Sequence, residues 1–129
     1  MTGEALAPVL RIKLQITSGD EIAMGPGKAD LLDAIAREGS ISGAGRAMGM
    51  SYRRAWLLVD VMNRCWEMPL VVAHPGGSGR GGARLSEQGR AVLALYRALQ
   101  GEAGALRSGA NWEQLAGALL PQPRVHQRD

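Results

Sequence analysis

Residues 38–56 read EGSISGAGRAMGMSYRRAW, and this stretch decides the fold. It predicts a short helix that ends near Gly49 and a second helix that opens at Ser51, because glycine terminates helices and serine caps them. The first turn of the second helix is polar and basic. Two helices joined by a tight glycine turn form the layout that places side chains in the major groove of DNA.

The short helix is expected to run to Met48, with Ser42 as its N-cap. Gly43 and Gly45 each cost about 1 kcal/mol relative to alanine inside a helix, so packing must stabilise this one. The second helix is expected to reach about Trp66. Its predicted buried face consists of Ala55, Leu58, Val59, Met62 and Trp66, with Trp56 and Cys65 also assigned to packing.

Upstream of these helices, apolar and polar residues alternate from Val9 to Thr17. A period of two predicts a half-buried strand, and residues 21–24 can return as its partner, which gives an N-terminal hairpin over about residues 9–25. Helical spacing follows from Lys28 to Glu38, and Gly39 fits the position just past a helix end.

Downstream of them, Pro69 ends the second helix and two short strands flank a glycine-rich loop. This arrangement predicts a β-hairpin over about residues 70–85, which is the wing of a winged helix when it follows a helix-turn-helix. A long helix is expected over about residues 86–103. Its apolar stripe suggests a dimer seam, with packing on its own domain as the alternative; the stripe comprises Val92, Leu95, Tyr96 and Leu99.

The predicted fold class is therefore α+β, mainly α: a winged helix-turn-helix domain over residues 1–104. Residues 105–129 are expected to hold one short amphipathic helix and a disordered tail. The single cysteine excludes an internal disulfide, and no apolar run approaches the roughly 20 residues that span a bilayer. The N-terminus lacks the features of a signal peptide, so a cytoplasmic location is expected.

Charge is the next indication of function. The net charge is only +3, which permits nucleic-acid binding without demanding it. Seven arginines, however, lie in the stretch that runs from the helix pair to the start of the long helix: Arg46, Arg53, Arg54, Arg64, Arg80, Arg84 and Arg90. A solvated basic surface with no ligand is the alternative interpretation.

Residues from about Leu10 to Leu99 resemble the N-terminal DNA-binding domain of the ModE-type molybdate-responsive transcription regulators. The LysR-type regulators share a looser version of the first helices but lack the glycine-rich wing. The resemblance is carried by the order and spacing of these stretches: Gly39-Ser-Ile-Ser42, Met50-Ser-Tyr-Arg-Arg-Ala-Trp56 with Asn63, Pro69-Leu-Val71, and Gly76-Gly-Ser-Gly-Arg-Gly-Gly-Ala-Arg-Leu85 followed by Gly89.

The resemblance implies a winged-helix homodimer that binds a palindromic operator near genes for molybdate uptake or molybdenum enzymes. In the family, oxyanion sensing belongs to a separate pair of C-terminal barrel domains. Only about thirty residues follow the long helix here, so we expect a regulator without that sensor, and molybdate binding is not carried over. The sequence itself specifies neither the effector nor the particular genes that are regulated.

The chemistry of the candidate site follows from its side chains. An arginine can bind the O6 and N7 edge of guanine with two hydrogen bonds, so we assign base recognition to Arg53 or Arg54. Hydroxyl groups suit phosphate oxygens, so Ser51 and Tyr52 are assigned to the DNA backbone, as is Ser42. The wing adds two further DNA-binding candidates, Arg80 at its tip and Arg84.

Other function classes find less support. Gly77, Gly79 and Gly82 satisfy a G-x-G-x-x-G pattern, but a dinucleotide site requires that pattern to open a helix within a βαβ unit. The two histidines, His74 and His126, have no neighbouring nucleophile or ligand-like partner, so no enzyme activity, metal or cofactor is expected. A winged-helix dimer that serves as a protein-interaction platform, without a DNA site, is the remaining alternative.

Overall fold

We describe the fold from a computed structural model, which describes residues 7–75 and 81–127. The chain forms two compact units. One runs from Lys13 to Gln100, and the other joins the described residues up to Ile12 with those from Gly101 onward. Within the described residues, no helix is both long and apolar enough to cross a membrane.

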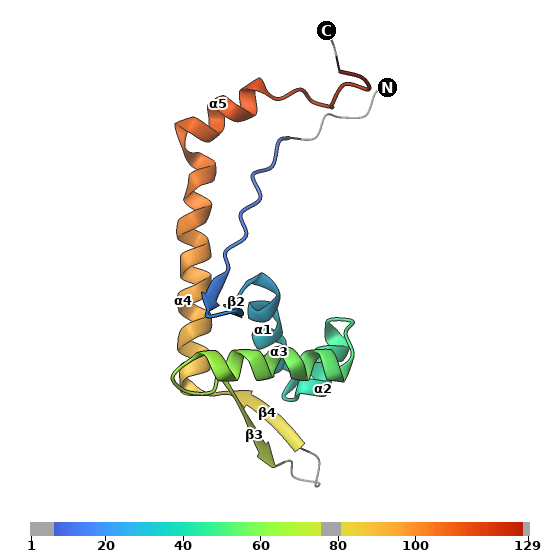
Figure 1. Cartoon of the computed structure of the whole chain (residues 1–129), viewed down its shortest axis with the longest axis vertical. Helices are drawn as coiled ribbons and strands as arrows, with labels where there is room; N and C mark the ends of the chain where they lie inside the picture. Colours follow the sequence, from blue (N-terminus) through green and yellow to red (C-terminus); the bar gives the residue numbers. More distant parts are fainter. Residues whose placement is uncertain (1–6, 76–80, 128–129) are drawn as a thin grey trace. The chain divides into compact units, whose positions relative to one another are not determined.

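The larger unit mixes helices with two small antiparallel sheets and is mainly helical (Figure 1). Its elements, in chain order, are β1 (Ile16–Ser18), β2 (Glu21–Met24), α1 (Pro26–Glu38), α2 (Ile41–Ala47), α3 (Tyr52–Cys65), β3 (Val71–Pro75), β4 (Gly81–Leu85) and the start of α4 (Glu87–Gly104). The predicted helices and the antiparallel pairing of the two strands around residues 70–85 are confirmed.

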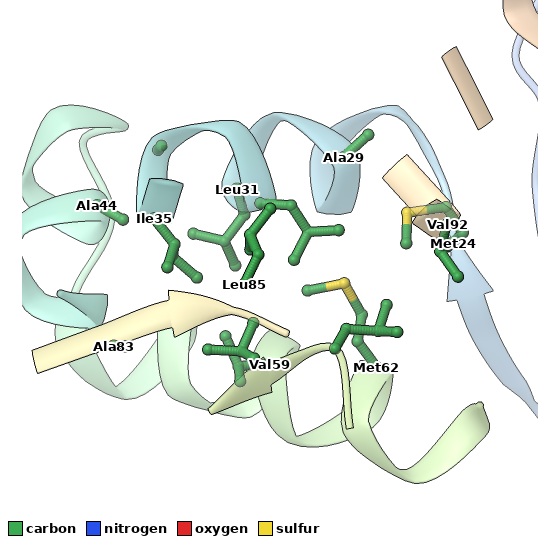
Figure 2. Close-up of a cluster of buried hydrophobic side chains, with 14 of the residues drawn as sticks. Met24, Ala29, Leu31, Ile35, Ala44, Val59, Met62, Ala83, Leu85 and Val92 are labelled. Atoms are coloured by element: carbon green, nitrogen blue, oxygen red, sulfur yellow. The ribbon is translucent and has the colours of Figure 1, made fainter. Parts of the chain in front are cut away.

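The core lies between α1, α3 and the β3–β4 hairpin, where aliphatic and methionine side chains replace the phenylalanines that the chain lacks (Figure 2). Its largest fully buried side chains are Met24, Leu31, Leu32, Ile35, Met62, Leu70 and Tyr96. Burial of each large apolar side chain contributes about 1.5–3 kcal/mol, so this cluster, which also includes Ala44 of α2 and Val92 of α4, holds the helices and the hairpin together.

The N-terminal strand is much shorter than predicted. The alternation is present in the exposure of the side chains, because Leu14 and Ile16 are half-buried whereas Gln15 and Thr17 face solvent. Only Ile16–Ser18 pairs as a strand, however. The reason is the partner: β2 has four residues before the chain turns into α1 at Pro26, so residues before Ile16 have no described strand opposite them.

The N-cap of α2 is Ser40 rather than the predicted Ser42. The Oγ atom of Ser40 accepts the backbone N–H of Gly43 at 2.9 Å, and Ser42 lies inside the first turn. A Cβ at Gly43 would lie 2.8 Å from that Oγ atom, and one at Gly45 would lie 3.2 Å from the carbonyl oxygen of Met50. The glycines that weaken this helix intrinsically therefore allow it to pack closely against its surroundings.

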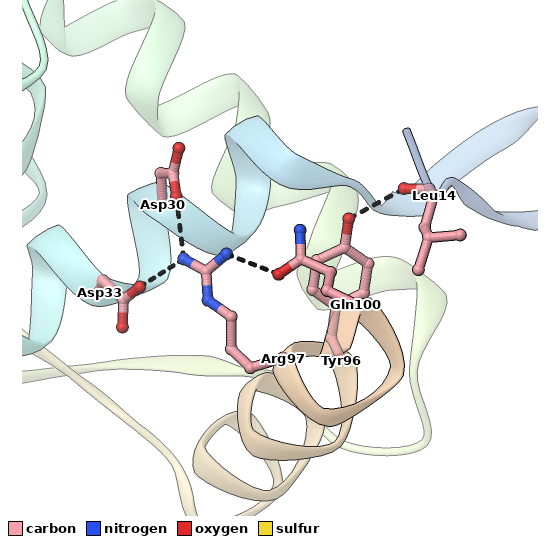
Figure 3. Close-up of polar contacts among 6 residues, drawn as sticks. All are labelled: Leu14, Asp30, Asp33, Tyr96, Arg97 and Gln100. Carbon is pink, nitrogen blue, oxygen red and sulfur yellow. Dashed lines mark hydrogen bonds and ion pairs between the residues drawn. The ribbon is translucent and has the colours of Figure 1, made fainter. Parts of the chain in front are cut away.

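Polar contacts connect α4 to α1 and to the N-terminal segment (Figure 3). The Nη2 atom of Arg97 donates to Asp30 at 2.8 Å and to Asp33 at 2.5 Å, and these hydrogen bonds raise the pKa of Arg97. One guanidinium thereby pairs with both carboxylates of α1. The buried hydroxyl of Tyr96 donates to the carbonyl of Leu14 at 2.9 Å, and burial raises the pKa of this phenol.

The smaller unit contains the end of α4, a single 3₁₀ turn (Ala105–Ser108) and helix α5 (Ala110–Ala118). The Nε atom of Arg107 donates to the carbonyl of Leu10 at 2.9 Å, which ties the turn to the N-terminal segment. The sequence predicted a short helix over about residues 112–120, and α5 lies in that region with both ends two residues earlier. Residues 119–127 contain neither helix nor strand.

Substitution by alanine should have opposite effects on stability at Gly89 and at Gly101, which both lie inside α4. A Cβ at Gly89 would lie 2.1 Å from the carbonyl oxygen of Leu70, whereas one at Gly101 would meet nothing within 4 Å. Gly89→Ala should therefore lower the free energy of unfolding by about 3 kcal/mol through overpacking. Gly101→Ala should raise it by about 0.5–1 kcal/mol, because alanine favours helix. Urea denaturation measures both, and equal effects at the two positions would contradict the packing.

Candidate nucleic-acid interface

A four-residue turn joins α2 to α3. Gly49 adopts a left-handed conformation with φ of 70°, and the N–H of Met50 donates to the carbonyl of Gly45 at 2.9 Å. Ser51 then caps α3, as predicted, by accepting the backbone N–H of Arg54 at 3.1 Å. Because α3 starts directly after this turn, its first residues are presented to solvent beside α2.

The first turn of α3 exposes three of the predicted site residues. Tyr52, Arg53 and Arg54 are all exposed, so their side chains are free of the core. Ser51 is also exposed, while Ser42 on α2 is half-buried. Arg84 is exposed on β4, and Arg80 lies outside the described residues. The structure thus brings together candidates from α2, α3 and the hairpin on one compact unit.

The arginines of the larger unit divide into two groups. Arg37, Arg64 and Arg97 make ion pairs with carboxylates; Arg64, for example, pairs with Asp60 and Glu21, and these hydrogen bonds raise its pKa. Five exposed arginines make no ion pair with a described carboxylate: Arg46, Arg53, Arg54, Arg84 and Arg90. Four of them lie on α2, the first turn of α3 and β4, which are the elements of the candidate interface, while Arg90 lies on α4 and donates to the carbonyl of Leu85.

Trp56 does not have the packing role that the sequence suggested. Its side chain is 46% exposed, one helical turn after Tyr52 on α3. Helical spacing could not show this, because Trp56 lies on the flank between the buried stripe of Ala55 and Val59 and the solvent face. The residue borders a hollow of about 520 Å³ between α3 and the β3–β4 hairpin.

Asn63 fixes the position of the hairpin relative to α3. Its Oδ1 atom accepts the backbone N–H groups of Leu70 and Val71 at 2.8 and 3.1 Å, and its Nδ2 atom donates to the carbonyl of Val71 at 3.0 Å. One amide thereby satisfies three backbone groups where the chain enters β3. The sequence signal for this role was a polar residue on the inner half of an otherwise apolar helix face.

The four residues of the predicted dimer stripe on α4 differ in burial. Val92 and Tyr96 are buried within their own unit, so they are occupied by intramolecular packing and do not form an exposed seam. Leu95 is 70% exposed and Leu99 is 41% exposed. Any dimer contact through the larger unit therefore depends on Leu95 and Leu99 alone among these four residues.

The geometry of the described residues does not support the alternative sites, which are a dinucleotide site at the glycine-rich loop and a metal site. Gly77 and Gly79 lie outside the described residues, and Gly82 belongs to β4, which continues as strand and not as the helix that a dinucleotide site requires. The Nδ1 atom of His74 lies 3.3 Å from the carbonyl oxygen of Pro75, its own neighbour. In residues 7–75 and 81–127, no group of three potential metal ligands comes together.

Comparison with known proteins identifies relatives of this chain. No protein-family model matches the chain. It is 46% identical over 78 residues to the molybdenum-pterin-binding protein MopA of Rhodobacter capsulatus, which covers 60% of this chain and 29% of that protein. It is 38% identical over 88 residues to the DNA-binding transcriptional dual regulator ModE of Escherichia coli K12, covering 68% and 32%. The molybdenum transport protein ModE of Azotobacter vinelandii is 47% identical over 70 residues, covering 54% and 26%.

These homologues are ModE-type proteins. The chain spans about a third or less of the length of the curated relatives it matches. The comparisons therefore support a molybdenum-related regulator. Because the chain spans so little of each relative, similarity alone does not assign the activity of the full-length relatives to it.

The Asn63 contacts predict a specific loss of stability. Asn63→Ala leaves two N–H groups and one carbonyl without partners and should lower the free energy of unfolding by about 2–4 kcal/mol. Asn111, the other asparagine of the chain, is exposed and provides the matched control. Thermal or urea denaturation followed by circular dichroism compares the variants. Similar stability of Asn63→Ala and Asn111→Ala would contradict the structural role of the amide.

Proposed function

We propose that this chain is a transcriptional regulator of the ModE type that binds double-stranded DNA through a winged helix-turn-helix. In this proposal α2 and α3 are the helix-turn-helix, α3 enters the major groove, and the β3–β4 hairpin is the wing. The observation that carries the proposal is the division of the arginines: those of α2, the first turn of α3 and β4 stay exposed without a carboxylate, while Arg37, Arg64 near the end of α3, and Arg97 are paired. Exposed, unneutralised cations on a groove-sized helix suit a polyanion.

Each side chain has an assigned role. Arg53 or Arg54 reads a guanine edge, because a guanidinium can donate two hydrogen bonds to O6 and N7. Ser51 and Tyr52 hold phosphate oxygens, and Ser42 adds a hydroxyl from α2. Ser51 can keep its capping role while its own hydroxyl proton is donated to a phosphate, since capping uses only the oxygen as an acceptor. Arg84 and Arg80 bind the backbone or the minor groove from the hairpin.

The regulator acts as a homodimer on a palindromic operator in this proposal, because two-fold symmetric sites match two-fold symmetric proteins. Leu95 and Leu99 supply apolar contact area on α4. The relatives named for molybdenum transport and for transcriptional regulation support target genes for molybdate transport or molybdenum enzymes. A cytoplasmic location fits such a role.

Selection of bound duplexes from a random pool is the direct test of DNA binding. The expected result is an enriched palindrome whose affinity falls steeply with salt, because phosphate neutralisation releases counterions. A folded dimer that enriches no sequence and shifts no duplex at low salt would overturn the proposal and favour the interaction platform.

Substitution of an α3 arginine tests its assigned role. Arg53→Ala should weaken operator binding by about 1–3 kcal/mol if the guanidinium reads a base, with a much smaller loss on random DNA. Arg37→Ala is the matched control, because Arg37 also lies exposed at a helix surface but pairs with Glu38. Fluorescence anisotropy of labelled duplexes measures both. Equal losses on operator and random DNA would reassign Arg53 to a phosphate contact.

The assembly is tested on α4. Leu95→Glu should shift a homodimer toward monomer, because a carboxylate would be buried without a partner at the proposed seam. Met68→Glu is the control, since Met68 is a comparably exposed apolar residue outside α4. Sedimentation or light scattering at micromolar concentration reports the change. An unaltered dimer in Leu95→Glu would remove α4 from the interface.

A further inference from the structure

The hollow between α3 and the β3–β4 hairpin has no role in the assignments above. Its walls come from α2, α3 and both hairpin strands, and its volume is about 520 Å³. Two ring side chains, Tyr52 and Trp56, stand on the α3 side. The opposite side includes Gly81, where a Cβ would meet nothing within 4 Å. The hollow is therefore open to a ligand that has both apolar and polar groups.

Two tryptophans, Trp56 within α3 and Trp66 at its C-terminal end, have different surroundings. Trp66 is half-buried, packs against the core and donates its Nε1 hydrogen to the carbonyl of Ala23 at 3.3 Å. Trp56 is nearly half exposed, and its indole makes no hydrogen bond with a described residue. Large apolar side chains left exposed at a concave surface typically mark a binding site.

The charges around the hollow indicate an anionic occupant. No carboxylate is found among the described residues that line it, and hydroxyl groups are contributed by Ser40, Ser42 and Tyr52. The elements that form the hollow also carry four of the exposed arginines that lack an ion pair, Arg46 on α2, Arg53 and Arg54 on α3, and Arg84 on β4. A polyanion whose charged groups are separated by apolar faces fits this combination.

We infer that this hollow holds one strand of the DNA duplex, with the rings of Trp56 and Tyr52 packed against deoxyribose. The inference rests on the proposed function and adds a contact surface to it. A strand that passes from the groove occupied by α3 to the hairpin must cross the space between these elements. The sugar then meets the rings, while the flanking phosphates meet the hydroxyl groups and arginines.

Tryptophan fluorescence tests the contact directly, because the chain has three tryptophans and each can be removed separately. Binding of duplex DNA should change the emission of the wild type, Trp66→Phe and Trp112→Phe, but not of Trp56→Phe. Trp56 should also be quenched by acrylamide in the free protein and be protected in the complex. A full emission change in Trp56→Phe, or no protection of Trp56, would overturn the inference.

Salt dependence separates this apolar contact from a charged one. Trp56→Ala should weaken binding about tenfold on operator and random duplex alike, as expected for the loss of a buried aromatic contact. The slope of log affinity against log salt should stay unchanged, whereas Arg53→Ala should reduce it by about 1 if that arginine neutralises a phosphate. Met68→Ala is the control for an exposed apolar side chain outside the hollow. Unchanged affinity in Trp56→Ala, in a protein shown by circular dichroism to be folded, would overturn the inference.

The outcomes also distinguish this inference from the proposed function. If the wild type binds no duplex at low salt, the proposed function fails and the inference fails with it. If the wild type binds DNA but Trp56 remains accessible to acrylamide, the proposed function stands and only the role of the hollow is excluded.

Discussion

The hydrogen bonds of the Asn63 side chain set the geometry on which the interface depends. Between Cys65 and Val71 the backbone leaves a helix and enters a strand, so its polar groups have no regular partners. A single amide near the end of α3 binds three of these groups and so couples the direction of the hairpin to that of the helix. The width of the hollow, and the separation between the α3 side chains and the hairpin, follow from this coupling.

Close backbone approach maintains the same geometry from the other side of the hairpin. The N–H of Ser86 donates to the carbonyl of Leu70 at 2.8 Å, and Gly89 allows α4 to start directly against that carbonyl. The N–H of Ala83 donates to the carbonyl of Gly39 at 2.9 Å, which joins β4 to the end of α1. These contacts need residues without side chains at two positions, Gly39 with its φ of 77° and Gly89. The hairpin is thus held at both strands before any ligand binds.

Local signals predicted much of this fold from the sequence. Glycine and serine at the helix ends placed the boundaries of α1 and α3 within about two residues, and the glycine-rich loop predicted the hairpin. The features that were missed depend on long-range contacts. The length of β1 depends on its partner strand, and the pairing of Arg97 with Asp30 and Asp33 joins residues more than sixty positions apart. The exposure of Trp56 was missed, and the choice between a dimer seam and intramolecular packing for Tyr96 stayed open, because periodicity does not show how deep a helix flank lies. The sequence predicted Ser42 as the cap of α2, whereas the extended backbone of Ser40 makes Ser40 the cap.

The separation of paired from unpaired arginines has a consequence for how the molecule meets a polyanion. Arg64 and Arg97 neutralise carboxylates on β2, α3 and α1, so these regions contribute little net field. The remaining exposed arginines lie mostly on α2, the first turn of α3 and β4, with Arg90 on α4, and they give the larger unit an uneven field despite a formal charge of only +3 for the whole chain. At physiological ionic strength such a field reaches about 8 Å. Encounters within that distance would be oriented before contact, so the frequency of productive collisions should exceed what the small overall charge suggests.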